Sequence, residues 1–198
     1  MNGVRVEMNE GETMIQSIGV LGAGQMGNGI AQVAACAGYD VVMIDIKDEY
    51  VEKGLGTIQF SLGKLVSKER MTQADADAAL ARITTGTDRG LCADCDLVVE
   101  AVPEILSLKQ EIFTELDGIC KPETILASNT SSISITTIAA STKRPDKVIG
   151  MHFMNPVPIM KLVEIINGAD TSEATNTAVV EAAEKMGKTA LSCNDAPG

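Results

Sequence analysis

The sequence predicts an α/β fold with a mostly parallel, doubly wound sheet. Short apolar runs rich in β-branched residues alternate with longer segments whose apolar residues recur at helical spacing. Strands and helices in this order pair in parallel through crossover helices. A glycine-rich turn at residues 22–27 directly follows the first run and opens a helix. Such a turn is typical of this fold class, so the two observations agree.

The composition fits one domain and excludes several functions. The chain has 198 residues, of which 45% are hydrophobic and 22% charged, so it can bury a full core. Its net charge of −11 argues against binding to nucleic acid, which needs a dense positive surface. No apolar run reaches the roughly 20 residues of a membrane span. The five cysteines are odd in number and scattered, which predicts no disulfide framework and fits a reducing, cytoplasmic location.

The first unit reads β-α-β over residues 15–45, about the length that such a unit needs. Residues 1–14 before it are polar and aperiodic, so they are expected to be a flexible leader rather than a signal or transit peptide. A β-branched run at 17–21 predicts the first strand, and small apolar residues at 30–37 predict a helix. The apolar run at 39–44 predicts the second strand.

A helix-turn-helix insertion is expected after the second strand, at about residues 48–82. Apolar residues from Val51 to Leu65 recur at steps of three or four and predict one helix, although glycines among them lower its helix propensity. Thr72 is placed to cap a second, alanine-rich helix. The insertion therefore enlarges a single domain that is expected to span residues 15–198.

The remaining residues continue the alternation. Apolar, β-branched runs predict strands, and one-sided apolar stripes or alanine-rich segments predict helices. Ser131 or Ser132 is expected to cap the helix that follows them. The expected strands lie at 83–87, 97–102, 124–127, 147–153, 162–166 and 189–193, and the expected helices at 74–81, 105–116, 133–140 and 171–186.

The glycine-rich turn predicts a Rossmann-type dinucleotide site. Gly22 permits the tight turn, Gly24 lets the backbone approach a pyrophosphate, and Gly27 lets the helix pack against the strand. Free N–H groups and the helix dipole favour the anion. Asp45, 18 residues after Gly27, is expected to accept bonds from both ribose hydroxyls, which favours NAD over NADP. An ordinary glycine turn and an FAD site are the weaker alternatives.

The only histidine, His152, lies at the end of a predicted strand, where ligands of parallel sheets bind. Glu164 follows 12 residues later within an apolar run, and a carboxylate there is costly unless it has a partner. We expect the imidazole to be that partner, because a carboxylate orients the ring of a general base and stabilises its charged form. The alternative is that Glu164 faces water on an edge strand.

Two further motifs allow more than one interpretation. Residues 128–132, Ser-Asn-Thr-Ser-Ser, follow a short strand and could cap the next helix, bind substrate, or do both. Cys92 and Cys95 have the spacing of a metal-binding pair, but no second pair or extra histidine is near in sequence. No metal site is therefore expected.

Taken together, the motifs resemble the N-terminal NAD-binding domain of the L-3-hydroxyacyl-CoA dehydrogenase family, close to bacterial 3-hydroxybutyryl-CoA dehydrogenases. The resemblance covers about residues 15–198, and its motifs are specific in their order and spacing. They are the glycine turn within 18–27, Asp45, and the segments 98–104, 127–132, 152–158, 161–165 and 195–198. The insertion is similar to the helical arm of the family.

The resemblance implies the reversible, NAD-dependent oxidation of (S)-3-hydroxyacyl-CoA to 3-oxoacyl-CoA. It implies that His152 takes the hydroxyl proton, that Glu164 holds His152, and that Ser131 bonds the substrate oxygen. The implied cofactor-binding positions are Gly22, Ala23, Gly24, Gln25, Met26, Gly27, Asp45, Glu104, Lys109, Ser131 and Asn155. The implied substrate-binding positions are Ser61, Lys68 and Ser131.

One departure from the family pattern limits what the resemblance implies. In the family, the motif at 195–198 leads into a C-terminal all-helical domain that completes the acyl pocket and supplies most of the contact of a homodimer. These 198 residues stop at this motif, so they are expected to lack that domain and, on their own, to bind NAD but to turn over poorly. The alternatives are a related sugar-acid dehydrogenase and a non-catalytic NAD-binding protein. The latter has no need of His152 with Glu164, so the pair favours an enzyme.

Overall fold

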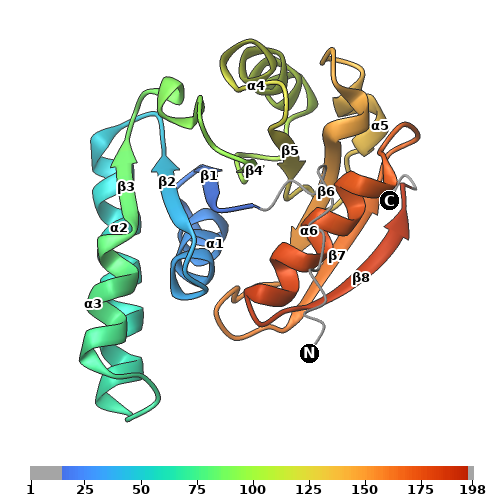
Figure 1. Ribbon diagram of the computed structural model, residues 1–198. Helices are drawn as coiled ribbons and strands as arrows, with labels where there is room; N and C mark the ends of the chain where they lie inside the picture. The colour runs from blue at the N-terminus through green and yellow to red at the C-terminus, as the bar shows by residue number, and fades with distance from the viewer. Residues whose placement is uncertain (1–14, 196–198) are drawn as a thin grey trace, which may run out of the picture.

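The computed structural model describes residues 15–195, which form one eight-stranded sheet with helices on both faces (Figure 1). The strands are β1 (Ser17–Leu21), β2 (Asp40–Ile44), β3 (Ile83–Gly86), β4 (Leu97–Glu100), β5 (Ile125–Ser128), β6 (Val148–Phe153), β7 (Leu162–Asn167) and β8 (Thr189–Asn194). The helices are α1 (Gln25–Cys36), α2 (Asp48–Ser67), α3 (Gln73–Ala81), α4 (Leu106–Ile119), α5 (Ile135–Ala139) and α6 (Glu173–Lys185). These confirm the predicted elements, whereas the short 3-10 helices η1 (Arg89–Cys92) and η2 (Pro145–Lys147) were not predicted. The leader expected at residues 1–14 lies outside the described residues.

The strand order is β3-β2-β1-β4-β5-β6-β7-β8, and all neighbouring strands are parallel except β6 and β7. The order reverses between β1 and β4. The chain therefore leaves these two strands in opposite directions, which opens a crevice at the carboxyl edge of the sheet. This topology confirms the predicted doubly wound, mostly parallel fold and places the glycine turn beside the crevice.

Two apolar cores lie on opposite faces of the sheet. Helices α1, α2, α3 and α6 supply buried side chains to one core, and α4 and α5 supply them to the other. Successive strand residues alternate between the cores, so Leu97 and Val99 of β4 pack in the first and Val98 in the second. Burial on both faces is the usual state of a parallel sheet. No helix among residues 15–195 is both long and apolar enough to cross a membrane.

The close packing of α1 and α2 against the glycine turn explains two glycines. A Cβ at Gly27 would lie 1.6 Å from the carbonyl oxygen of Gly22, and one at Gly54 would lie 2.7 Å from that of Ala23. A side chain at either position would displace backbone. Gly54 lowers the helix propensity of α2 by about 1 kcal/mol relative to alanine, but it lets this helix lie directly on the turn.

The short helix α5 begins later than the sequence predicts. Its N-cap is Ser134, whose hydroxyl accepts a bond from the Thr137 N–H at 3.2 Å. The expectation that Ser131 or Ser132 caps this helix is therefore wrong. Those two serines have another partner, because both of their N–H groups donate to the carboxylate of Glu104.

Two carboxylates fix the chain just after it leaves a strand. Strand β4 ends at Glu100, two residues before its predicted end, because the Glu100 side chain accepts a bond from the Val102 N–H at 2.7 Å. Near the other end of the chain, Asp195 accepts bonds from the Ser134 hydroxyl at 2.7 Å and the Thr136 N–H at 2.9 Å. Asp195 thus fastens the segment after β8 to the start of α5.

The cysteine pair predicted not to bind metal lies in the second core. A Cβ at Gly19 of β1 would be 2.7 Å from Cys92 Sγ and 3.5 Å from Cys95 Sγ, so the two thiols fill the space that this glycine leaves. Burial raises the pKa of the nearby Cys120 thiol to about 11. Within residues 15–195, no cluster of three or more His, Cys, Asp or Glu side chains is arranged to hold a metal ion. Buried against Gly19, the Cys92 and Cys95 thiols pack as small apolar groups.

Asp96, just before β4, fastens the start of β1 to the loop after α4. Its carboxylate accepts bonds from the N–H groups of Gln16 at 2.8 Å and Ser17 at 2.9 Å, and Lys121 Nζ lies 2.6 Å away. Burial alone would raise the pKa of this carboxyl, but the lysine and the N–H donors outweigh it and hold the pKa below its ordinary value of 3.8. The stabilisation from Asp96 is therefore complete above the ordinary pKa of 3.8, which applies to the unfolded chain. It is lost as the pH falls through the lower pKa of the folded state.

We predict that Asp96→Asn lowers the free energy of unfolding by about 1–3 kcal/mol at pH 7, because an amide replaces a charged acceptor. Urea titrations at pH 7 and pH 3 test this. The difference in free energy of unfolding between Asp96→Asn and the wild type should be smaller at pH 3 than at pH 7. Asp94→Asn is the matched control, since Asp94 is an exposed neighbour. Equal losses in both variants, or an unchanged difference at pH 3, would contradict the prediction.

Candidate active site

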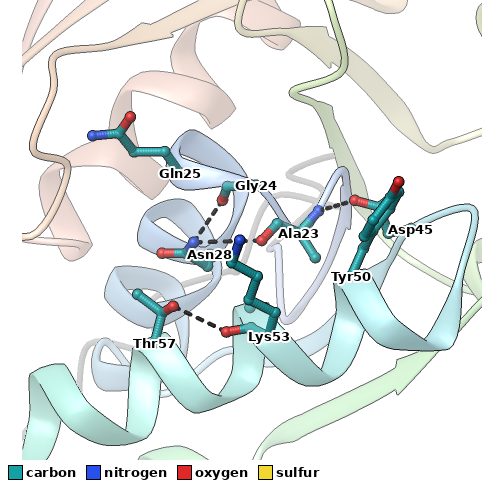
Figure 2. A pocket seen from close by; sticks show the side chains of 9 residues that line it. Ala23, Gly24, Gln25, Asn28, Asp45, Tyr50, Lys53 and Thr57 are labelled. Carbon is teal, nitrogen blue, oxygen red and sulfur yellow. Dashed lines mark hydrogen bonds between the residues drawn. The ribbon is translucent and has the colours of Figure 1, made fainter.

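Two cavities lie at the carboxyl edge of the sheet. The first, about 420 Å³, is lined by the glycine turn, Asp45 after β2, and one face of α2 (Figure 2). The second, about 310 Å³, is lined by the start of α1 and by residues at the ends of β4, β5 and β6. Gln25 lines the first cavity and donates a bond of 3.2 Å to the Asn155 side chain, which lines the second. The two cavities are therefore adjacent.

The glycine turn leaves backbone donors free at the first cavity. Helix α1 begins at Gln25 with Gly24 as its N-cap, and no side chain caps its N–H groups. A Cβ built at Gly24 would meet nothing within 4 Å, so the space in front of it is open to a ligand. Gly22 has a φ of 99°, which favours glycine. Unpaired N–H groups at a helix N-terminus bind anions such as a pyrophosphate.

Asp45 lies at the mouth of the first cavity, where the sequence places it. One carboxylate oxygen accepts a bond from the Ala23 N–H at 2.7 Å, and the other accepts from the Ile46 N–H at 2.7 Å. These bonds hold the carboxylate between the glycine turn and the end of β2. Each oxygen keeps a lone pair for a further donor, so the group can accept two hydroxyls of a ribose.

Helix α2 contributes Tyr50, Lys53 and Thr57 to the first cavity, and none of the three was expected there from the sequence. Figure 2 shows Lys53 reaching from α2 toward the glycine turn and Tyr50 beside Asp45. Their spacing in the sequence could have indicated this, because residues three and four positions apart lie on the same face of a helix. Lys53 can supply positive charge to an anionic ligand.

The second cavity brings together several residues that the sequence analysis singled out. Met26 comes from α1, Glu104 from the loop after β4, Ser131 from the loop after β5, and His152 and Asn155 from β6 and the turn that follows it. These positions are spread over 130 residues of the sequence. Ala101, Val102, Asn129, Phe153 and Met154 complete the lining.

His152 and Glu164 form the pair that the sequence predicts. They lie directly opposite each other on the antiparallel strands β6 and β7, and His152 Nδ1 is 2.8 Å from Glu164 Oε2. Strand β8 pairs with the other side of β7, so Glu164 is not on an edge strand and that alternative is wrong. With Nδ1 engaged by a carboxylate, Nε2 is the nitrogen left to exchange a proton with a ligand.

Glu104 holds the loop that carries Ser131. Its Oε1 accepts bonds from the Ser131 N–H at 3.1 Å, the Ser132 N–H at 3.3 Å and the Thr130 hydroxyl. Burial alone would raise the pKa of Glu104, but the Thr130 hydroxyl and the nearby Lys109 ammonium outweigh it and hold the pKa below its ordinary value. Glu104 therefore carries a negative charge at the wall of the second cavity at neutral pH.

Five predicted contact residues lie outside both cavity linings, namely Gly22 and Gly27 of the glycine turn, Lys109, Ser61 and Lys68. Lys109 is 1% exposed, and its Nζ lies 2.7 Å from Glu100 and 3.3 Å from Glu104. Ser61 is half-buried on α2, and Lys68 is the exposed C-cap of that helix. Ser61 and Lys68 lie four and eleven positions beyond Thr57, so they continue the helix face that lines the first cavity, over about 16 Å. Their ligand contacts stay predictions.

The fold and the site define a Rossmann-type dinucleotide-binding domain, with a cavity at the glycine turn and a histidine–carboxylate pair beside it. Residues 17–196 match the family described as "3-hydroxyacyl-CoA dehydrogenase, NAD binding domain", and the chain belongs to this family.

Two similar sequences and one solved structure illustrate the relationship. The chain is 57% identical over 180 residues to the "Probable 3-hydroxybutyryl-CoA dehydrogenase" of Deinococcus radiodurans, covering 91% of this chain and 64% of the relative. It is 49% identical over 184 residues to the 3-hydroxybutyryl-CoA dehydrogenase of Bradyrhizobium diazoefficiens, covering 93% and 63%. The crystal structure of (S)-3-hydroxybutyryl-CoA dehydrogenase from Ralstonia eutropha superposes with a TM-score of 0.91 at 48% identity, covering 93% and 65%. The chain thus spans less than two thirds of the length of these relatives.

We predict that Asp45→Ala weakens NAD binding by roughly 10–100-fold, because a charged acceptor for the ribose is lost. The same change should reduce the preference for NAD over NADP, since the carboxylate repels a 2′-phosphate. Dissociation constants for both coenzymes, measured by calorimetry, test this. Asp40→Ala is the matched control, because Asp40 is an exposed residue at the opposite end of β2. An unchanged coenzyme preference in Asp45→Ala would refute the assigned role of this residue.

Proposed function

We propose that this chain is the NAD-binding domain of an enzyme that reversibly oxidises (S)-3-hydroxyacyl-CoA, with 3-hydroxybutyryl-CoA as its substrate, to 3-oxoacyl-CoA. The observation that carries the proposal is the His152–Glu164 pair, which lies in a cavity beside the dinucleotide cavity. A protein that only binds NAD has no need of a carboxylate-held imidazole there. The names of the similar proteins support the substrate class.

The proposed reaction moves one proton and one hydride. His152 Nε2 takes the proton of the 3-hydroxyl while C3 releases its hydride, which leaves a carbonyl at C3. NAD, when bound, supplies the hydride acceptor. Glu164 orients the imidazole through Nδ1 and stabilises the charge that the ring gains. The Ser131 hydroxyl, on the loop after β5, donates a hydrogen bond to the same substrate oxygen. In the reverse direction His152 returns the proton to the 3-oxo group.

The proposed ligand contacts follow the two cavities and the face of α2. Residues 22–27 and Asp45 bind the pyrophosphate and ribose of NAD, and Glu104, Lys109, Ser131 and Asn155 hold its nicotinamide end. Ser61 and Lys68 contact the CoA portion of the substrate. A chain with a net charge of −11 needs local positive charge to attract this polyanion, and Lys68 supplies it at the exposed end of α2.

The proposal includes a larger protein around this domain. Because the relatives are longer by about one third of their length, we propose that a further domain completes the acyl pocket and joins two copies into a homodimer. The isolated chain would then bind NAD and turn over slowly. We also propose a cytoplasmic location, which fits the five cysteines of the sequence.

His152→Gln should lower turnover about 100-fold or more in the full-length protein, because glutamine cannot take the proton. The assay follows NADH oxidation with acetoacetyl-CoA, and the dissociation constant for NAD should change little. Glu164→Gln should cause a smaller loss, since the imidazole remains. Retention of activity in His152→Gln would overturn the proposed mechanism.

Lys68→Glu should raise the KM for acyl-CoA about 5–10-fold and leave the KM for NAD unchanged. Added salt should reduce the difference in KM for acyl-CoA between Lys68→Glu and the wild type, because salt screens exposed charges. Lys143→Glu is the matched control, with the same change of charge at an exposed position. Equal KM values for acyl-CoA in the two variants would contradict a CoA contact at Lys68.

A further inference from the structure

Glu100 has no part in the mechanism above, yet it ties three segments together beneath the second cavity. Its side chain is fully buried at the end of β4. One carboxylate oxygen accepts bonds of 2.7 Å from Lys109 Nζ of α4 and from the Val102 N–H, and the other accepts a bond of 2.7 Å from the Ser128 hydroxyl of β5. Glu100 itself lines neither cavity.

These bonds belong to a closed ring. Lys109 continues from Glu100 to Glu104, whose Oε2 lies 3.3 Å from the ammonium. Ser128 continues from Glu100 to the next loop, because its hydroxyl accepts the Thr130 N–H at 3.2 Å. The Thr130 hydroxyl donates to Glu104 and closes the ring. The ring therefore fixes the loop that carries Glu104 relative to the loop that carries Ser131.

The ring also sets the charge at the cavity wall. It contains two carboxylates and one ammonium, and the ammonium is nearer to Glu100, at 2.7 Å, than to Glu104, at 3.3 Å. Glu100 and Lys109 are 0% and 1% exposed, so each needs the other as a partner. The unbalanced negative charge then belongs to Glu104, whose side chain is 39% exposed at the second cavity.

This charge matters for the cofactor under the proposed function. Hydride transfer requires the nicotinamide ring beside the carbon that His152 serves, so we expect the ring in the second cavity. The nicotinamide ring is a cation in NAD⁺ and is neutral in NADH. A carboxylate at the cavity wall therefore stabilises the oxidised cofactor more than the reduced one.

We propose that Glu100 is a positioning residue that, by holding Lys109, leaves the Glu104 charge directed at the nicotinamide and so favours NAD⁺ over NADH. This inference rests on the proposed function. If Glu100 loses its charge, Lys109 has only Glu104 to balance, and the net charge of the ring of hydrogen-bonded side chains changes from −1 to zero. The preference for the oxidised cofactor should fall with it.

The test is the ratio of the dissociation constants of NADH and NAD⁺, measured by calorimetry on this chain. Glu100→Gln should lower the ratio roughly tenfold. Glu104→Gln should lower it by a similar factor, because it removes the charge directly. Glu111→Gln is the matched control, an exposed position on the same helix with the same change of charge, and should leave the ratio unchanged.

A double variant, Glu100→Gln with Lys109→Met, separates charge from folding. It removes both buried charges, so it should fold even where Glu100→Gln alone does not, and it leaves Glu104 unbalanced. Because Lys109 is itself a proposed cofactor contact, both dissociation constants should rise in this variant, but their ratio should stay within twofold of the wild type, since the net charge of the three groups is again −1. A tenfold lower ratio in the double variant, or an unchanged ratio in a folded Glu100→Gln, would overturn the inference. Failure of the wild-type chain to bind either cofactor would instead refute the proposed function.

Discussion

The reversal of strand order between β1 and β4 is the constraint on which the site depends. It separates the glycine turn after β1 from the loop after β4 and so creates the crevice in which the dinucleotide cavity lies. The side chains proposed to act in catalysis then lie along one edge of the sheet, the carboxyl edge. The parallel strands β4, β5 and β6 deliver Glu104, Ser131 and His152 to the same cavity. The single antiparallel pairing, β6 with β7, places Glu164 opposite His152.

Much of this arrangement could be predicted from the sequence because its signals are local. The glycine turn, the apolar, β-branched runs of the strands and the helical stripes each span few residues and have a direct physical meaning. The pairing of His152 with Glu164 was also predictable, since a carboxylate within an apolar run needs a partner and the chain has one imidazole. The position of Asp45 at the first cavity was predictable from its sequence distance to the glycine turn.

The rest depends on contacts that no local pattern encodes. The start of α5 moved to Ser134 because Glu104, far away in sequence, engages the N–H groups of Ser131 and Ser132. The Glu100–Lys109 pair was hidden for the same reason, because a lysine on a helix usually faces water. Here α4 packs so that Lys109 points inward to a buried carboxylate. The end of β4 follows from the Glu100 bond to the Val102 N–H, and the proposed charge balance at the second cavity follows from the Glu100–Lys109 pair.

Under the proposed function, proton and hydride leave the substrate in the cavity beside His152. A crystal structure of the chain with NAD and acetoacetyl-CoA tests it most directly. We predict the nicotinamide ring in the second cavity and the 3-oxo oxygen within hydrogen-bond distance of His152 Nε2, with the Glu164 bond to Nδ1 retained. A nicotinamide ring outside that cavity, or a 3-oxo group turned away from His152, would refute the proposed role of His152.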